Sequence, residues 1–360
     1  MLLRLRRPTT LLLTALLPAS LALAACGSDD SELKGFDAVS ISGKVGETPK
    51  LDWKGTMTAE AAKSKVVTKG DGAALKDGDI VKVEFTLADG WTHKVTYDSY
   101  QDTKLSRVVR IGAKAADPTS LSDVLALGLD GQIKAGQTIG SRIAVTVGSD
   151  KAFGNYFGSQ AASLLADLDI GNEDGMLYVA DIVGLAKPEG ATQAAPAWAP
   201  KVVEKDGIPT GLDFTGVPAP NGQLRVAVLT KGTGPVVKSG QETILNYVGQ
   251  LAKGKKPFDE SFTRGGFTAV LGGAQASVVK GWSQGLVGQT VGSRVILEIP
   301  PSLGYGNKAQ GTDIPANSTL YFVVDVLDTA KPEPTPAPTG AASPSGSTSA
   351  PASPSATPSQ

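Results

Sequence analysis

The stretch that decides the fold runs from Tyr247 to Phe322 and continues to Val326, and it contains six short motifs. In order, they are Tyr247-Val-Gly249, Pro257-Phe-Asp259, Val278-Val-Lys-Gly-Trp282, Leu303-Gly-Tyr-Gly-Asn307, Ile314-Pro315 and Tyr321-Phe-Val-Val-Asp-Val326. Aromatic and β-branched residues are typical of strands that pack on an apolar core. At these intervals they predict a small apolar pocket with one carboxylate.

The residues around these motifs predict mostly strands. Gln223–Thr230 and Thr243–Leu251 alternate as half-buried strands, and Arg294–Ile299 is a further strand closed by two prolines. Only Val278–Leu286 has the pattern of a short helix. Antiparallel strands with one short helix predict an α+β domain in which the helix covers one face of the sheet.

The composition excludes several classes of function. With 34 Lys and Arg against 35 Asp and Glu, the chain has no charge excess that would favour nucleic acid as a partner. His93 and Cys26 are its only His and Cys, so we expect no metal site, no disulfide framework and no Cys/His catalytic pair. We also expect no cofactor, and no feature indicates an oligomer, so a monomer is expected.

The first 26 residues have the layout of a secretory signal: a basic start, an apolar run and a small-residue end. We assign residues 1–25 as a lipoprotein signal peptide, because Leu23-Ala-Ala-Cys26 resembles a bacterial lipobox. That resemblance implies that Cys26 is lipidated and holds the protein at the outer face of the plasma membrane. The alternative is a cleaved signal with an incidental cysteine.

Both ends of the mature chain are poor in large apolar residues. Residues 26–34 are small, polar and acidic, and we expect a flexible spacer. Residues 330–360 consist almost entirely of Pro, Ala, Ser, Thr and Gly, so we expect a disordered tail. A glycosylated or wall-threading tail is the alternative.

The middle of the chain contains an internal repeat. The segment 67–78 recurs at 229–240, which is 162 positions later (Thr68 to Thr230), and 136–143 recurs at 288–295, which is 152 positions later (Gly136 to Gly288). Two matches in the same order indicate a duplicated domain. We place one domain at 35–186, a Pro- and Ala-rich linker at 187–200, and a second domain at 201–329.

Residues 229–327 resemble an FKBP-type peptidyl-prolyl cis-trans isomerase along nearly their whole length. The resemblance implies an α+β fold with two FKBP-like domains, each a twisted antiparallel β-sheet wrapped on one short α-helix. It implies an enzyme that isomerises X-Pro bonds, and the N-terminal signal adds the expectation that its substrates are exported proteins as they fold. Proline-containing polypeptides are the implied partners, and macrolide-type inhibitors are implied ligands.

The resemblance also implies the site residues. Trp282 would form the pocket floor, and the Tyr305 hydroxyl and the Val279 N–H would donate hydrogen bonds to substrate carbonyls. Asp259 would orient side chains, although it could instead be a turn residue after Pro257-Phe258, and its role stays open. The implied catalytic residues are Tyr247, Phe258, Asp259, Trp282, Tyr305 and Phe322. The implied substrate-binding residues are Arg264, Phe267, Val278, Val279 and Ile314.

The first copy lacks part of this set. Phe85 matches Tyr247, Tyr97-Asp98 matches Phe258-Asp259, Phe153 matches Tyr305, Tyr178 matches Phe322, and Leu125 falls opposite Trp282. Because the indole floor and the phenolic donor are lost, we expect a degenerate domain with weak or no isomerase activity. A chain that binds Pro-containing segments without turnover, as a non-catalytic chaperone or binding lipoprotein, is the alternative function.

Labelling cells with a clickable fatty acid tests the lipid anchor. The protein should take up the label, and the Cys26→Ala variant should not, because the thiol is the acceptor. A parent chain without label would contradict the assignment, as would equal labelling of the variant.

Overall fold

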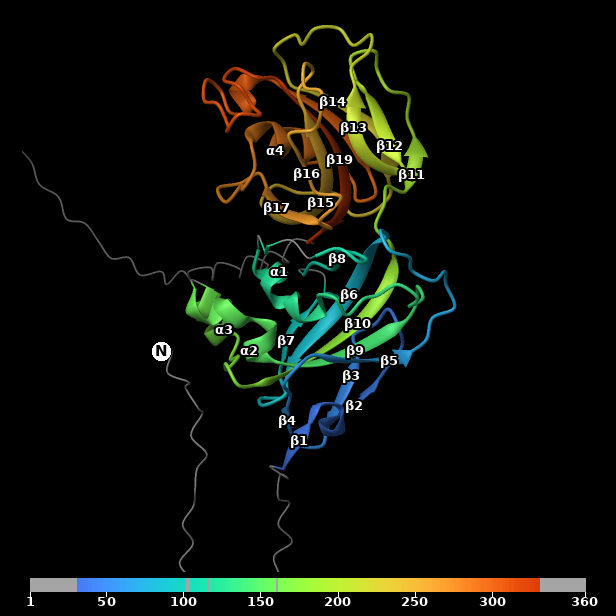
Figure 1. Ribbon diagram of the computed structural model, residues 1–360, viewed down its shortest axis with the longest axis vertical. Helices are drawn as coiled ribbons and strands as arrows, with labels where there is room; N and C mark the ends of the chain where they lie inside the picture. The colour runs from blue at the N-terminus through green and yellow to red at the C-terminus, as the bar shows by residue number, and fades with distance from the viewer. Residues whose placement is uncertain (1–30, 102–103, 115–116, 119, 160, 331–360) are drawn as a thin grey trace, which may run out of the picture.

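The computed structural model describes residues 31–101, 104–114, 117–118, 120–159 and 161–330, which form two large antiparallel sheets and three two-stranded ones (Figure 1). We call residues 31–185 the N-terminal half and residues 190–330 the C-terminal half. The predicted signal peptide, Cys26 and the tail beyond Ala330 lie outside the described residues. No helix among the described residues combines the length and apolar character needed to cross a membrane.

The C-terminal half is built on a seven-stranded sheet. In spatial order its strands are β11 (Gly190–Thr192), β14 (Arg225–Gly232), β18 (Arg294–Ile299), β19 (Leu320–Thr329), β15 (Gln241–Gln250) and β16 (Asp259–Glu260), and β17 (Phe267–Leu271) also pairs with β15. All these pairs are antiparallel. The helix α4 (Lys280–Leu286) packs on one face of this sheet, against β17 and β18, as the sequence predicts.

The central strand β19 has apolar side chains on both faces, because successive side chains point in opposite directions. Phe322 and Val324 pack in the cluster beneath α4. Tyr321 and Val323 pack in a second cluster on the opposite face. The apolar run at the end of the second copy therefore forms a strand that is buried on both sides.

The N-terminal half repeats this strand order. Its strands are β5 (Lys63–Thr68), β9 (Arg142–Gly148), β10 (Gly175–Leu185), β6 (Ile80–Asp89) and β7 (Val95–Asp98), with β8 (Arg107–Arg110) also paired to β6. The order corresponds strand by strand to β14, β18, β19, β15 and β16, with β17 paired to β15. The sequence repeat is thus accompanied by a repeat of sheet topology.

The N-terminal half contains more helices than the single short one that we expected, so this prediction is wrong for this half. It contains α1 (Leu121–Leu125), α2 (Ser149–Ala152) and α3 (Ala161–Asp167). The last two lie in the long connection between β9 and β10, where Leu165 is fully buried and anchors α3 on the core. The corresponding connection of the C-terminal half begins with Pro300-Pro301 and forms only a 3₁₀ turn, η4 (Pro301–Leu303). The other 3₁₀ turns are η1 (Gly35–Ala38), η2 (Leu127–Leu129) and η3 (Gly154–Gly158).

Two segments expected to be irregular contain short strands. Glu32–Lys34, expected to belong to the flexible spacer, forms β1, which pairs in parallel with β4 (Thr56–Thr58). Gly190–Thr192, expected to belong to the linker, forms β11 at the edge of the C-terminal sheet. Neither segment has an apolar pattern, and both form because a neighbouring strand offers unpaired backbone groups.

A β-hairpin precedes each sheet and covers a buried ion pair. The hairpin of β2 (Val39–Ser42) and β3 (Lys50–Trp53) covers Arg142 and Asp181, and the carbonyls of Lys44 and Glu47 accept hydrogen bonds from the Arg142 Nη2 atom at 2.7 and 2.6 Å. The hairpin of β12 (Lys201–Lys205) and β13 (Ile208–Asp213) covers the matching pair of Arg294 and Asp325, and Glu204 contacts Arg294.

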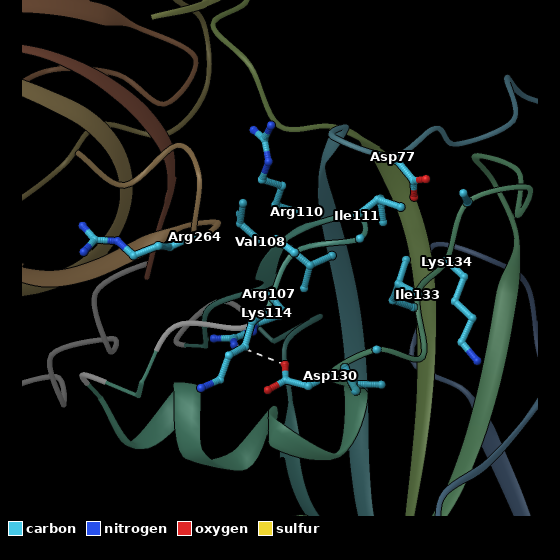
Figure 2. Close-up of a pocket in the computed structure, with 16 residues that line it drawn as sticks. Asp77, Arg107, Val108, Arg110, Ile111, Lys114, Asp130, Ile133, Lys134 and Arg264 are labelled. Carbon is cyan, nitrogen blue, oxygen red and sulfur yellow. Dashed lines mark hydrogen bonds and ion pairs between the residues drawn. The ribbon is translucent and has the colours of Figure 1, made fainter. Parts of the chain in front are cut away.

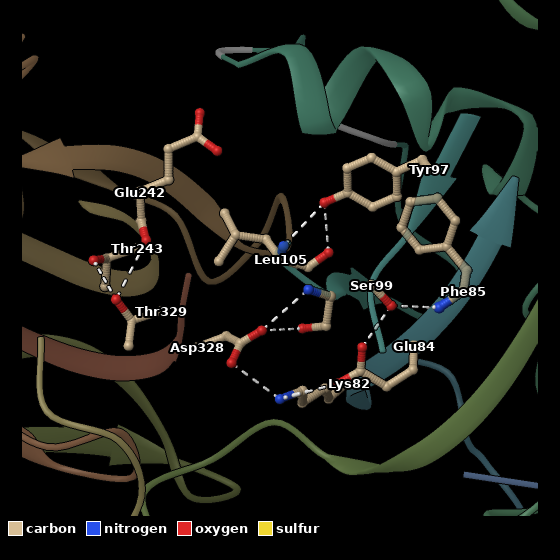
Figure 3. Close-up of polar contacts among 11 residues, drawn as sticks. Lys82, Glu84, Phe85, Tyr97, Ser99, Leu105, Glu242, Thr243, Asp328 and Thr329 are labelled. Atoms are coloured by element: carbon tan, nitrogen blue, oxygen red, sulfur yellow. Dashed lines mark hydrogen bonds and ion pairs between the residues drawn. The ribbon is translucent and has the colours of Figure 1, made fainter. Parts of the chain in front are cut away.

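The two halves pack directly on each other. Ile80, Leu105 and Val108 of the N-terminal half share an apolar cluster with Ile244 and Phe262 of the C-terminal half. Beside it, the Asp328 carboxylate accepts hydrogen bonds from Lys82 (3.1 Å) and from the Ser106 hydroxyl (2.7 Å) (Figure 3). The described contacts therefore join the halves by both apolar and charged groups.

Removing one partner of the buried ion pair should destabilise the protein strongly. Asp181→Ala leaves the fully buried Arg142 guanidinium without its carboxylate, which costs about 3–5 kcal/mol. Asp150→Ala removes the carboxylate of the exposed pair with Lys151 and should cost no more than about 1 kcal/mol. Urea unfolding measures both. Equal unfolding midpoints for the two variants would contradict a structural role for the buried pair.

Candidate functional site

Five aromatic side chains of the C-terminal half form one cluster. They come from β15 (Tyr247), β17 (Phe267), α4 (Trp282), β19 (Phe322) and the residue before β16 (Phe258). The Trp282 ring lies 5.1 Å from those of Tyr247 and Phe322 and 6.2 Å from that of Phe267, measured between centroids. Phe258 lies 5.5 Å from Phe322. All these pairs are edge-to-face, the arrangement that the charge distribution of aromatic rings favours.

Trp282 lies at the centre of this cluster and is 3% exposed. It contacts three of the other four rings, as expected of a pocket floor. Its indole N–H is buried and has no hydrogen-bond partner among the described residues. A buried donor without a partner costs stability, so packing alone does not account well for a Trp at this position.

The Asp259 carboxylate beside the cluster is held by two side-chain donors. The Tyr247 hydroxyl donates a hydrogen bond to Asp259, and the Arg264 guanidinium donates another to the Asp259 Oδ1 atom at 3.0 Å. Burial and the bond to Asp259 raise the pKa of the Tyr247 hydroxyl. Burial opposes the charge of Arg264, but the Asp259 carboxylate raises its pKa overall. Tyr247 therefore stays protonated, and Asp259 is oriented by both neighbours.

Two hydrogen-bond donors at the rim have no partner in the described part of the chain. Tyr305 lies just after η4, and its residue is 37% exposed. Partial burial and the nearby Asp259 charge raise the pKa of its hydroxyl. The backbone N–H of Val279 lies at the N-cap of α4. Neither group donates a hydrogen bond to another described residue, so both can donate to a bound molecule.

The remaining residues of the predicted set line the same region. Ile314 is buried in the cluster beneath α4, and Val278 and Val279 are half-buried against it. Arg264 lies at the edge, on the loop between β16 and β17. The fold thus brings all eleven predicted pocket residues to one face of the C-terminal sheet and its adjoining loops.

Gly249 is a part of this region that the sequence reasoning missed. It lies two residues after Tyr247 on the same face of β15, and a Cβ atom there would come within 2.6 Å of both the Phe258 and the Phe322 ring. The close approach of the two rings therefore requires glycine. The alternation of β15 could have indicated this, since the residue two positions after a pocket aromatic must point to the same side.

The pairing register corrects the expected match between the two copies. In the C-terminal half Asp259 pairs with Gly249, and in the N-terminal half Tyr97 pairs with Leu87. The Tyr247 N–H donates a hydrogen bond to the Ser261 hydroxyl, and the Phe85 N–H donates one to the Ser99 hydroxyl. These matching bonds align the two halves in the same way as the strand pairing does. Tyr97 is therefore the counterpart of Asp259, and the match of Asp98 to Asp259 is wrong by one residue. That slip puts Asp98 on the opposite face of the sheet, where it accepts a hydrogen bond from Thr86.

The region is filled by side chains in the N-terminal half. Leu87 stands where the C-terminal half has Gly249, and it is fully buried. The Tyr97 ring stacks on Phe85 at 5.0 Å, and its hydroxyl donates to the Leu105 carbonyl. Leu125 and Phe153 are also buried in this core. At the matching positions the N-terminal half therefore has buried Tyr97 in place of the Asp259 carboxylate, buried Leu87 in place of Gly249, and buried Phe153 in place of Tyr305.

Comparison with known proteins agrees with this geometry. Residues 234–327, which include the whole aromatic cluster, match the family model described as FKBP-type peptidyl-prolyl cis-trans isomerase. Over 108 residues the chain is 38% identical to FK506-binding protein 1 of Aspergillus oryzae, a match that covers 28% of this chain and 92% of that protein. It is 41% identical over 108 residues to FK506-binding protein 1A of Neurospora crassa, covering 29% of this chain and 86% of that protein.

A longer relative shares the same segment. FK506-binding protein 4 of Chaetomium thermophilum is 45% identical over 97 residues, which are 27% of this chain and 19% of that protein. The chain thus spans about a fifth of that relative. The matched segment is an FKBP-type peptidyl-prolyl cis-trans isomerase domain with an α+β fold. The chain belongs to the FKBP-type peptidyl-prolyl cis-trans isomerase family.

A methyl group at Gly249 should disturb the aromatic cluster. Gly249→Ala should destabilise the protein by about 1–3 kcal/mol, because the added carbon pushes on the Phe258 and Phe322 rings. Gly184→Ala is the matched control, since a Cβ atom at that strand position meets nothing within 4 Å. Urea unfolding of both variants checks this. A Gly249 variant as stable as the control would show that the rings do not need this space.

Proposed function

We propose that this chain catalyses cis–trans isomerisation of X-Pro peptide bonds and that the aromatic cluster of the C-terminal half is its active site. The observation that carries the proposal is the position of the cluster. Trp282, Tyr247 and Phe322 surround an apolar region whose rim has the free donors of Tyr305 and Val279. This cluster lies within the segment that matches the isomerase family.

The reaction needs no nucleophile. Rotation about an X-Pro bond has a barrier of ~18–20 kcal/mol because of the partial double-bond character of the amide. The twisted amide of the transition state has lost this resonance, so a site that binds it better than either planar form accelerates the reaction. In the proposed mechanism the proline ring packs on Trp282, and the Tyr305 hydroxyl and the Val279 N–H hold the neighbouring carbonyls.

Asp259 supports the site rather than reacting with substrate in this mechanism. It accepts the Tyr247 hydroxyl and the Arg264 guanidinium, and it thereby fixes one aromatic wall. Its counterpart in the N-terminal half is Tyr97, so the fold itself does not require a carboxylate at this position. We therefore assign Asp259 a positioning role in the active site.

We further propose that the chain contains two FKBP-like domains and that only the second is an isomerase. The repeated strand order supports the duplication. Buried Leu87, Leu125 and Phe153 support loss of the pocket in the first domain. The predicted boundaries, 35–186 and 201–329, belong to this proposal.

The cellular setting is also a proposal. The lipobox-like sequence at Cys26 supports anchoring to the outer face of the plasma membrane, where the enzyme would act on exported proteins as they fold. Proline-containing polypeptides are the proposed partners. Macrolides of the FK506 type are proposed ligands, because relatives that match the same segment are named for binding FK506. We propose that the protein acts as a monomer.

A binding protein without turnover is the second candidate. The buried N-terminal counterpart of the pocket favours a non-catalytic role for that half alone, as a spacer or a chaperone surface. Isomerase rate and suppression of aggregation, both measured for the complete protein and its variants, separate the two functions.

Substitutions in the C-terminal cluster should lower the isomerase rate on a short proline peptide. Tyr305→Phe removes one donor and should lower kcat/KM about tenfold, which corresponds to ~1.4 kcal/mol. Trp282→Leu, which places the residue type of Leu125 at the floor, should lower it at least as much. Tyr156→Phe, on the N-terminal half, is the control and should leave the rate unchanged. Parent-like rates for both cluster variants would reject the assigned site.

A further inference from the structure

A cleft between the two halves opens directly beside the proposed active site. It has a volume of about 760 Å³, within the usual range for ligand-binding pockets. Four of its lining residues are Tyr247, Asp259, Arg264 and Phe267 of the C-terminal half. We call it the junction cleft; the N-terminal half lines it with Arg107, Val108, Ala113, Lys114, Asp117 and Asp123.

The N-terminal wall of the junction cleft is formed by β8 and the residues that follow it. A second cavity of about 450 Å³ lies along the same strand and shares Arg107, Val108, Ala113, Lys114 and Arg264 with the cleft. Figure 2 shows Arg264, from the C-terminal half, beside Val108 and Arg110 of β8. The two cavities therefore continue one another along β8, away from the aromatic cluster.

Contacts between the halves hold this wall in place. The Arg110 guanidinium donates a hydrogen bond to the Phe262 carbonyl at 2.9 Å. The Thr268 hydroxyl donates one to the Asp123 carboxylate at 3.2 Å. A Cβ atom at Gly266 would come within 3.0 Å of the Val108 side chain, so the loop that contains Arg264 packs closely on β8. These contacts thus join the two walls of the cleft.

Most charges that line the junction cleft are already paired. Arg107 forms an ion pair with Asp123 at 2.7 Å, and Arg264 forms one with Asp259 at 3.0 Å. Lys114 and Asp117 remain, both exposed and without a described ion-pair partner. Lys114 and Asp117 thus offer one positive and one negative charge beside the apolar side chains of Val108 and Phe267. Such a lining is more complementary to a polypeptide with mixed side chains than to a polyanion.

We propose that the junction cleft binds the polypeptide on one side of the substrate proline, so that the N-terminal half contributes to substrate recognition. This inference rests on the proposed isomerase function. Tyr247, Asp259 and Phe267 belong both to the aromatic site and to the wall of the cleft. A polypeptide whose proline lies on Trp282 can therefore extend past these residues into the cleft, and this is why we infer a polypeptide as its occupant. Short peptides would fill only the aromatic site, and longer ones would also contact Ala113 and Lys114.

Two peptides test the proposal on the complete protein. One has four residues with a single proline, and the other has the same four residues at the centre of about twelve, which extend to roughly 40 Å. Ala113→Trp fills the cleft away from the aromatic cluster. It should raise KM for the long peptide about tenfold and leave kcat/KM for the short peptide unchanged, as measured by NMR exchange. Ala162→Trp, at a half-buried position on α3 outside both cavities, is the control.

A charge reversal gives an independent test that does not depend on packing. Lys114→Glu should shift the ratio of KM values for long peptides with acidic and basic flanks about three- to tenfold in favour of basic flanks, as expected for one exposed charge. Lys151→Glu, on α2 and equally exposed, should not shift it. Equal effects of Ala113→Trp on both peptide lengths, or no effect together with an unchanged charge preference, would overturn the proposal.

The two proposals can fail separately. If the parent protein isomerises neither peptide, the proposed function fails. Binding of the fluorescently labelled long peptide to the parent and to Ala113→Trp then tests the cleft. Weaker binding to Ala113→Trp than to the parent would support the cleft, and equal or undetectable binding to both would overturn it.

Discussion

The structure of the C-terminal half depends on one constraint, the burial of both faces of β19. Phe322 and Val324 point to the aromatic cluster under α4, and Tyr321 and Val323 point to the cluster shared with the N-terminal half. Because side chains alternate along a strand, the register that places Phe322 in the aromatic cluster also places Tyr321 at the junction of the halves. The proposed active site and the packing between the halves therefore depend on opposite faces of the same strand, and a shift in register would change both.

The N-terminal half acts as an internal control for the proposed active site. It has the same strand order, a matching serine bonded to β6 where the C-terminal half has one bonded to β15, and the same buried Arg–Asp pair, so these features belong to the fold. It differs where the C-terminal half has Gly249 and Asp259, since Leu87 and Tyr97 occupy those positions and are buried there. The close approach of the Phe258 and Phe322 rings to β15 thus requires glycine at position 249.

The polar groups of the proposed active site are arranged around the Asp259 carboxylate. Asp259 is bound by Tyr247 and Arg264, and in our proposal the Tyr305 hydroxyl and the Val279 N–H are the donors for a substrate. Arg264 lies on the loop that packs against β8, so this loop connects the proposed active site to the N-terminal half. In our proposal the same loop separates the aromatic site from the junction cleft and forms a wall of each.

The sequence alone determined the family, the repeat, the position of α4 and the set of aromatic residues around Trp282, because these follow from motif order and local periodicity. Strand pairing decided that Tyr97, and not Asp98, is the counterpart of Asp259. A short sequence repeat with different loop lengths does not specify this alignment. The role of Gly249 depended on two rings that approach it from other strands. The helices between β9 and β10 and the junction cleft likewise arise from packing between segments far apart in the chain, for which no local pattern exists.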